Sequence, residues 1–91
     1  MTSSSEAFEK FSRWKKLKTP LMVTVIVGGK TEDVLSCTIF GVDPEASQVG
    51  LSMGMHSARA VDLEDATLSI ETSRVVATRN DSDWLIFEES S

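Results

Sequence analysis

The side chains that could do chemistry in this chain are few and lie far apart. His56 is the sole histidine and Cys37 the sole cysteine. A nucleophilic centre would need His56 beside Ser57 or Cys37, and no Gly-x-Ser-x-Gly turn is present to expose a nucleophile. We therefore expect His56 to be an exposed loop residue and Cys37 to be a small buried hydrophobe. No residue is expected to be catalytic, so the sequence does not favour an enzyme.

Three polar segments could bind a cation or a phosphate group, but their spacing favours turns. The carboxylates of Asp62, Glu64 and Asp65 cluster without the spacing of a calcium loop. Residues 80–83 (NDSD) lack the glycine and terminal glutamate of such a loop, and residues 28–31 (GGKT) lack the earlier glycine and following helix of a P-loop. We expect three solvated turns here, and neither a metal nor a cofactor.

The composition is that of one small globular domain. The chain has 91 residues, of which 41% are hydrophobic and 25% are charged, so residues 1–91 can form a single core. Both ends are rich in Ser and Glu and are expected to fray. The single cysteine fits a reducing, cytoplasmic setting, and we expect no signal peptide and no membrane partner.

The charge balance argues against nucleic acid as a partner. The formal net charge is −5, whereas binding to phosphate groups usually needs a Lys/Arg-rich surface. One basic cluster is an exception, and it comprises Lys10, Arg13, Lys15, Lys16 and Lys18. We interpret it as a solvated helix face and expect no DNA binding.

The N-terminal segment predicts a helix over about residues 4–18. Ser3 is a suitable N-cap, and Glu6 completes a capping box three residues later. Proline at position 20 disfavours helical geometry in the residue before it, so the helix should end there. An apolar stripe at three-residue spacing comprises Phe8, Phe11, Trp14 and Leu17.

After Pro20 the apolar period changes to two, which predicts strands. The expected strands are residues 21–27, 34–42, 48–53, 67–79 and 84–88, and residues 58–63 could form a further short strand. The segment 67–79 fits either one bent strand or two. Because the first strand is apolar on both faces, we expect a small, strongly bent five- or six-stranded antiparallel barrel over about residues 21–88, covered by the helix. Trp14 and Trp84 are each expected in the core or at an interface.

The order of these segments resembles the Sm-like family, which has an N-terminal helix and a small open barrel of SH3 type. Residues 23–27 (VTVIV), the Gly29-Lys30 turn, residues 38–43 (TIFGVD) and residues 49–51 (VGL) are similar to the family's first motif. Residues 75–80 (VVATRN) and 84–87 (WLIF) are similar to its second motif. Asn80 stands where the family has glycine, and Asn also tolerates a left-handed conformation.

The resemblance implies a homo-oligomer. In the family, the last two strands pair edge to edge, and repetition of that contact builds a ring if the rotation closes. The expected interface residues are Val75, Val76, Ala77, Thr78, Trp84, Leu85, Ile86 and Phe87.

Two functions remain open at this point. The acidic charge and the absence of catalytic motifs favour a non-catalytic, oligomerising interaction or assembly module. The alternative is single-stranded RNA binding in the Sm-like manner, although the family's base-binding asparagine is absent and Ser47 or Gln48 lies nearby instead. The residues that would bind RNA are Asp43, Ser47, Gln48, Arg79 and Asn80.

Overall fold

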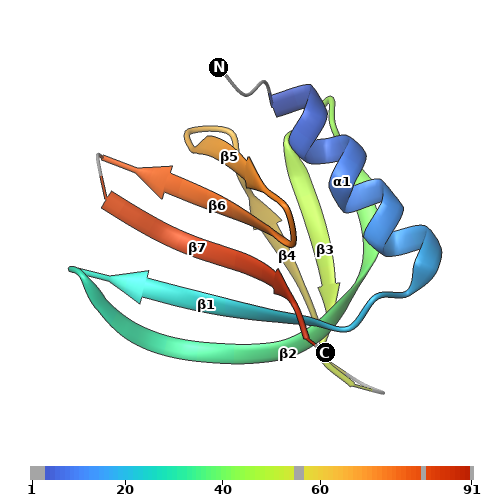
Figure 1. The fold of residues 1–91 in the computed structure, drawn as a ribbon, viewed down its shortest axis with the longest axis horizontal. Coiled ribbons are helices and arrows are strands. Elements are labelled where there is room, and N and C mark those ends of the chain that lie inside the picture. The colour runs from blue at the N-terminus through green and yellow to red at the C-terminus, as the bar shows by residue number, and fades with distance from the viewer. Residues whose placement is uncertain (1–3, 55–56, 81, 91) are drawn as a thin grey trace.

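The protein consists of an N-terminal helix and a strongly curved antiparallel sheet (Figure 1). The computed structural model describes residues 4–54, 57–80 and 82–90. Its elements are α1 (Ser4–Leu17), β1 (Leu21–Val27), β2 (Lys30–Asp43), β3 (Gln48–Ser52), β4 (Ala58–Asp62), β5 (Thr67–Glu71), β6 (Arg74–Arg79) and β7 (Ser82–Glu89).

The strands form one sheet in the order β4-β3-β2-β1-β7-β6-β5. Strand β7 returns to pair with β1, so the N-terminal and C-terminal strands of the sheet lie side by side. Each remaining contact joins strands that are consecutive in the chain through a short connection. The prediction of a mainly β, antiparallel fold behind one N-terminal helix is confirmed.

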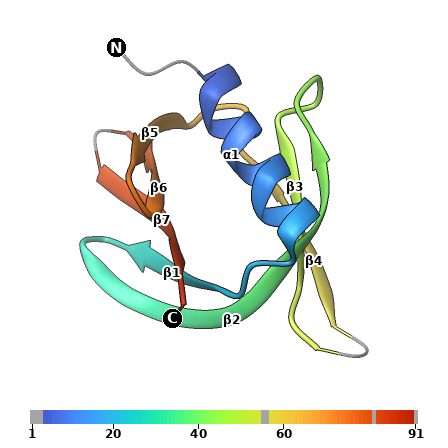
Figure 2. The same cartoon turned by 45° about the vertical axis from the view of Figure 1, so that its right-hand side comes forward.

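Strand β2 belongs to both halves of the sheet. Its residues 30–37 pair with β1, whereas its residues 38–43 pair with β3. The register shifts twice along β2, and the extra residues are Glu32 in the first half and Phe40 in the second. Because bulges increase bending and twist, β2 turns the corner between the two halves (Figure 2).

Helix α1 packs against the concave face of the sheet and fills part of it. The ring of Phe11 is fully buried and lies 5.0 Å from Phe87 of β7 and 5.5 Å from Phe8. Trp14 is 3% exposed, which places it in the core, one of the two locations predicted for it. The core is completed by apolar residues of the strands, among them Leu21, Val23, Ile39, Val49, Leu51, Val75 and Ala77.

The helix ends one residue earlier than predicted, with a closing turn before Pro20. The N–H of Thr19 donates to the Trp14 carbonyl oxygen at 3.0 Å, and Lys18 adopts a positive φ of 52°. This six-residue hydrogen bond with a left-handed residue is a Schellman motif, which satisfies carbonyl groups at the helix end. The predicted N-cap Ser3 lies outside the described residues.

Two predictions about the sheet are wrong. The sheet has seven strands in the described residues rather than five or six, because residues 67–79 form two strands, β5 and β6, joined at Thr72 and Ser73. The sheet also does not close into a barrel, since its terminal strands β4 and β5 each pair with one neighbour in the described structure. The helix occupies part of the concave interior that a closed barrel of this size would fill with strand side chains.

Candidate ligand-binding groove

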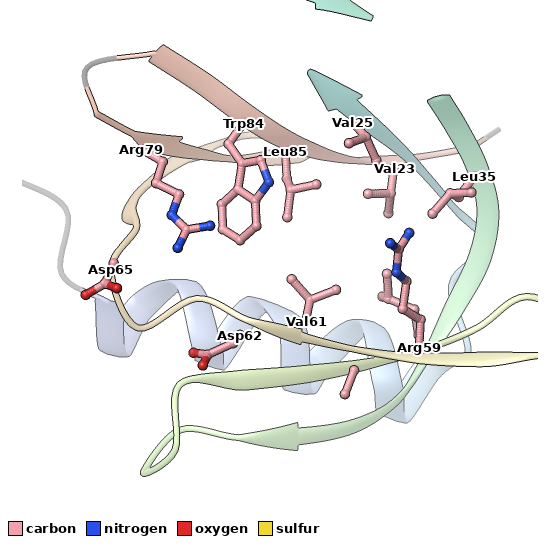
Figure 3. Close-up of a pocket in the computed structure, with 12 residues that line it drawn as sticks. Val23, Val25, Leu35, Arg59, Val61, Asp62, Asp65, Arg79, Trp84 and Leu85 are labelled. Carbon is pink, nitrogen blue, oxygen red and sulfur yellow. The ribbon is translucent and has the colours of Figure 1, made fainter. Parts of the chain in front are cut away.

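A groove of about 280 Å³ remains on the concave side, beside the part that α1 fills (Figure 3). Its walls come from both halves of the curved sheet. The residues that line it are Val23, Val25, Leu35, Leu51, Arg59, Ala60, Val61, Asp62, Asp65, Arg79, Trp84 and Leu85. The curvature of the sheet therefore creates a mixed recess, lined by eight apolar and four charged residues.

A β-bulge places Trp84 in this groove. Ala77 pairs with Leu85 and Thr78 pairs with Asp83, so Trp84 is an extra residue of β7 without a partner in β6. Side chains normally alternate between the faces of a strand, but the extra residue interrupts that alternation. As a result, the adjacent residues Trp84 and Leu85 both line the groove.

The groove carries two arginines in different surroundings. The guanidinium carbon of Arg79 lies 4.6 Å from the centre of the Trp84 ring, a cation–π contact at the end of the β6–β7 hairpin. Arg59 comes from β4 and points toward Val23 and Leu35 in Figure 3. In the described part of the chain neither arginine forms an ion pair. The one ion pair found there lies outside the groove and joins Arg74 to Glu71 at 2.9 Å, which raises the pKa of Arg74.

Two aspartates lie at the Arg79 end of the groove. Asp62, the last residue of β4, and Asp65, in the β4–β5 connection, lie at that end, away from the guanidinium of Arg59 (Figure 3). The Asp62 carboxylate also accepts a hydrogen bond from the Glu64 backbone N–H at 3.0 Å, which fits the predicted turn. The groove is therefore polarised, with a carboxylate-free end at Arg59.

The five residues predicted to bind RNA lie on two hairpin turns. The Asp43 carboxylate accepts the Ala46 backbone N–H at 3.2 Å, and Ser47 has a φ of 54°, so both shape the β2–β3 turn beside Gln48. Arg79 and Asn80 lie at the β6–β7 turn, where Asn80 adopts the expected left-handed conformation with a φ of 54°. Of the five, Arg79 lines the groove, and RNA binding through them stays a prediction.

The predicted interface strands lie in the interior of the sheet. Strand β6 pairs with β5 and β7, and β7 pairs with β6 and β1, so both have a hydrogen-bonded neighbour on each side. Several of the predicted interface side chains form the core of the chain itself: Val75, Ala77, Leu85 and Phe87. The strands at the ends of the sheet order are β4 and β5.

The other candidate residues occupy structural positions. Cys37 is 6% exposed, as expected of a buried hydrophobe, and burial raises the pKa of its thiol. Gly28 and Gly29 form the β1–β2 turn with positive φ angles of 59° and 79°. The described residues contain no cluster of His, Cys, Asp and Glu able to hold a metal ion. His56 and Asp81 lie outside those residues.

Sequence reasoning missed Arg59 as a member of a site. Its spacing from Val61, two residues along β4, puts the two residues on one face of the strand, and both line the groove. Arg59 is itself exposed, and an exposed arginine in a strand is too common to indicate a binding role from the sequence alone.

No protein-family model matches this chain, and comparisons with curated proteins and with solved structures give no match either. Among the described residues, no helix combines the length and the apolar character needed to cross a bilayer.

Proposed function

We propose that this protein is a non-catalytic interaction module that associates with a second copy of itself through the edge of β5. The observation that carries this proposal is the character of that edge. Strand β5 pairs with β6 alone and without a bulge. Its residues 67–70 (TLSI) carry no charge, and its one charged residue, Glu71 at the end of the strand, is ion-paired with Arg74 at 2.9 Å. An uncharged, regular edge strand presents free backbone donors and acceptors to another strand.

The other open edges of the sheet are better protected against pairing. The first half of β2 has β1 on one side and carries Lys30, Glu32 and Asp33, with a bulge at Glu32. Strand β4 carries Arg59 and Asp62 within five residues. Charged side chains and bulges are the usual means by which edge strands avoid pairing, so β5 is the favoured contact.

Two β5 strands can pair with each other around a twofold axis. In an antiparallel arrangement centred on Ser69, Leu68 of one copy lies opposite Ile70 of the other. Leu68 is 4% exposed and Ile70 is partly buried against the core, so the two cores would become continuous across the contact. Isologous pairing of this kind gives a closed dimer, the commonest symmetric assembly.

Light scattering coupled to size exclusion tests this proposal across a concentration series. We expect twice the monomer mass of 10.0 kDa, and we expect Ser69→Lys to give a monomer because a lysine on the edge strand opposes pairing. Ser12→Lys is the matched control, since Ser12 is an exposed residue of α1 and belongs to no strand.

A monomer at all concentrations overturns the proposal, as does a dimer that Ser69→Lys leaves intact. A larger ring that Ser69→Lys dissociates would support the β5 edge as the contact, with β4 of the next copy as its partner.

A further inference from the structure

We propose that the concave groove is a binding site for a small apolar carboxylate, such as a medium-chain fatty acid. The carboxylate binds to Arg59, and the apolar body lies along Val23 and Leu85 toward the ring of Trp84. This site is independent of the β5 edge.

The floor of the groove can accommodate an apolar body. Val23, Leu51 and Leu85 are 1%, 0% and 4% exposed, so they form a solid base, while Val25 and Val61 are partly buried at the sides. Because the floor itself is almost closed to water, a ligand gains apolar contact mainly by covering the parts of Val25, Val61 and Trp84 that remain exposed.

Arg59 provides the anchor for an anion. Its guanidinium faces Val23 and Leu35, and the described residues offer it no ion pair and no hydrogen bond (Figure 3). Arg59 is exposed, so its guanidinium is accessible to a ligand, and an arginine can bind a carboxylate through two parallel N–H···O hydrogen bonds. The free guanidinium therefore indicates a negatively charged ligand group at this end.

The charges at the other end determine the orientation of the ligand. Asp62 and Asp65 would repel a carboxylate from the Arg79 end, and the Arg79 guanidinium already stacks on Trp84. An acid should therefore bind with its carboxylate at Arg59 and its apolar end near Trp84.

The volume of the groove limits the size of the ligand. About 280 Å³ lies just below the range of roughly 300–1,000 Å³ typical of small-molecule sites. Long-chain lipids and sterols would extend into solvent, so a medium-chain or single-ring acid fits best.

The experiment is a titration of the labelled protein with octanoate, followed by backbone and side-chain N–H signals in NMR. We expect shifts of the Trp84 indole and of β4 and β1 signals, and affinity about tenfold weaker for the uncharged octanol, because a hydrogen bond to a charged group is lost. Arg59→Gln should weaken octanoate binding by a similar factor and leave octanol binding unchanged. Arg59→Lys should weaken it less, since the charge remains.

Arg13→Gln is the matched control, because Arg13 is exposed on α1 away from the groove and its loss should change neither affinity. Three results would overturn the proposal. The first is equal affinity for octanoate and octanol, and the second is equal octanoate affinity of the Arg59→Gln and Arg13→Gln variants. The third is a set of NMR shifts confined to residues outside the groove. Repeating the titration in the Ser69→Lys background separates this proposal from the dimer, since groove binding should survive there whether or not the protein self-associates.

Discussion

At the scale of single residues, Gly41 and Gly50 face each other across β2 and β3 but have different surroundings. A Cβ added to Gly50 would lie 2.7 Å from Cζ of the Phe40 ring, whereas a Cβ added to Gly41 would meet no atom within 4 Å. Phe40 is the bulge residue and is 54% exposed, so its ring covers Gly50 from the solvent side and can move away.

We expect Gly41→Ala to stabilise the protein by about 0.4–1 kcal/mol, because alanine restricts the unfolded chain and fits the native conformation. We expect Gly50→Ala to be less stable than Gly41→Ala by about 1 kcal/mol, since the Phe40 ring must leave its position. Urea denaturation of both variants measures the difference. In a Phe40→Ala background the difference should disappear, and its persistence there would contradict this explanation.

Local conformation was more predictable from the residues than membership of the groove. The left-handed conformation of Asn80 follows from its residue type, and the burial of Cys37 follows from its position in an apolar strand. The role of Trp84 could not be predicted, because it depends on a bulge that places two adjacent residues on one face. The sequence 84–87 (WLIF) carries no mark of that bulge.

At the scale of elements, the helix contributes to the core Phe11, which is among the largest fully buried side chains of the described residues. Phe11 is fully buried and packs edge-on against Phe87 at 5.0 Å, with Trp14 at 6.0 Å on its other side. A second link lies at the surface, where Nζ of Lys10 donates to the Thr72 carbonyl oxygen at 2.9 Å and so ties α1 to the β5–β6 turn.

We expect Phe11→Ala to lower the free energy of unfolding by about 3–5 kcal/mol, because it removes a buried ring and leaves a cavity between helix and sheet. Phe40→Ala is the size-matched control and should cost less than about 1 kcal/mol, since that ring is half exposed. Chemical denaturation followed by circular dichroism measures both. If the two variants lower the free energy of unfolding equally, the packing of Phe11 between α1 and the sheet does not stabilise the core as we expect.

Element type was well predicted, whereas element boundaries were predicted less well. The helix and the strands near residues 21–27 and 48–52 follow from clear apolar periods bounded by Pro20, Gly28 and Gly54. The division between β5 and β6 was ambiguous because their turn, Thr72 and Ser73, contains neither glycine nor proline. The true length of β2 was also missed, since residues 30–33 are polar and exposed.

At the scale of the whole molecule, the acidic net charge argues against RNA binding. Four of the basic residues lie on the helix α1: Lys10, Arg13, Lys15 and Lys16. Arg79 lies apart from them, on the β6–β7 hairpin, where its guanidinium stacks on Trp84. The net charge of −5 makes the surface as a whole repel phosphate groups.

We therefore expect no saturable binding of oligo(U) or oligo(A) by fluorescence anisotropy, even at low salt, where counterion release would favour it most. Micromolar, salt-sensitive binding that Arg79→Ala abolishes would contradict this expectation and favour the RNA alternative. Arg74→Ala is a matched control at the other end of β6.

Sheet closure was the part of the architecture that the sequence could not reveal. Apolar residues on both faces of the first strand indicated a sheet covered on both faces, but the structure covers one of them. Leu21 and Val23 are buried, whereas Met22 on the other face is 37% exposed. The covering of the concave face comes in part from α1 rather than from closure by further strands. Apolar periodicity therefore did not show how many faces are buried, nor which element buries them.

The division of β2 between two partners has a geometric consequence for the groove. The pairing of β2 changes from β1 to β3 between Cys37 and Thr38. The backbone conformation at this one peptide therefore sets the angle between the two halves of the sheet. Arg59 stands on one side of that peptide and Trp84 on the other. A change of a few degrees there would widen or narrow the space between them while leaving every strand's own pairing intact, so selectivity for ligand length could be retuned without redesigning either wall.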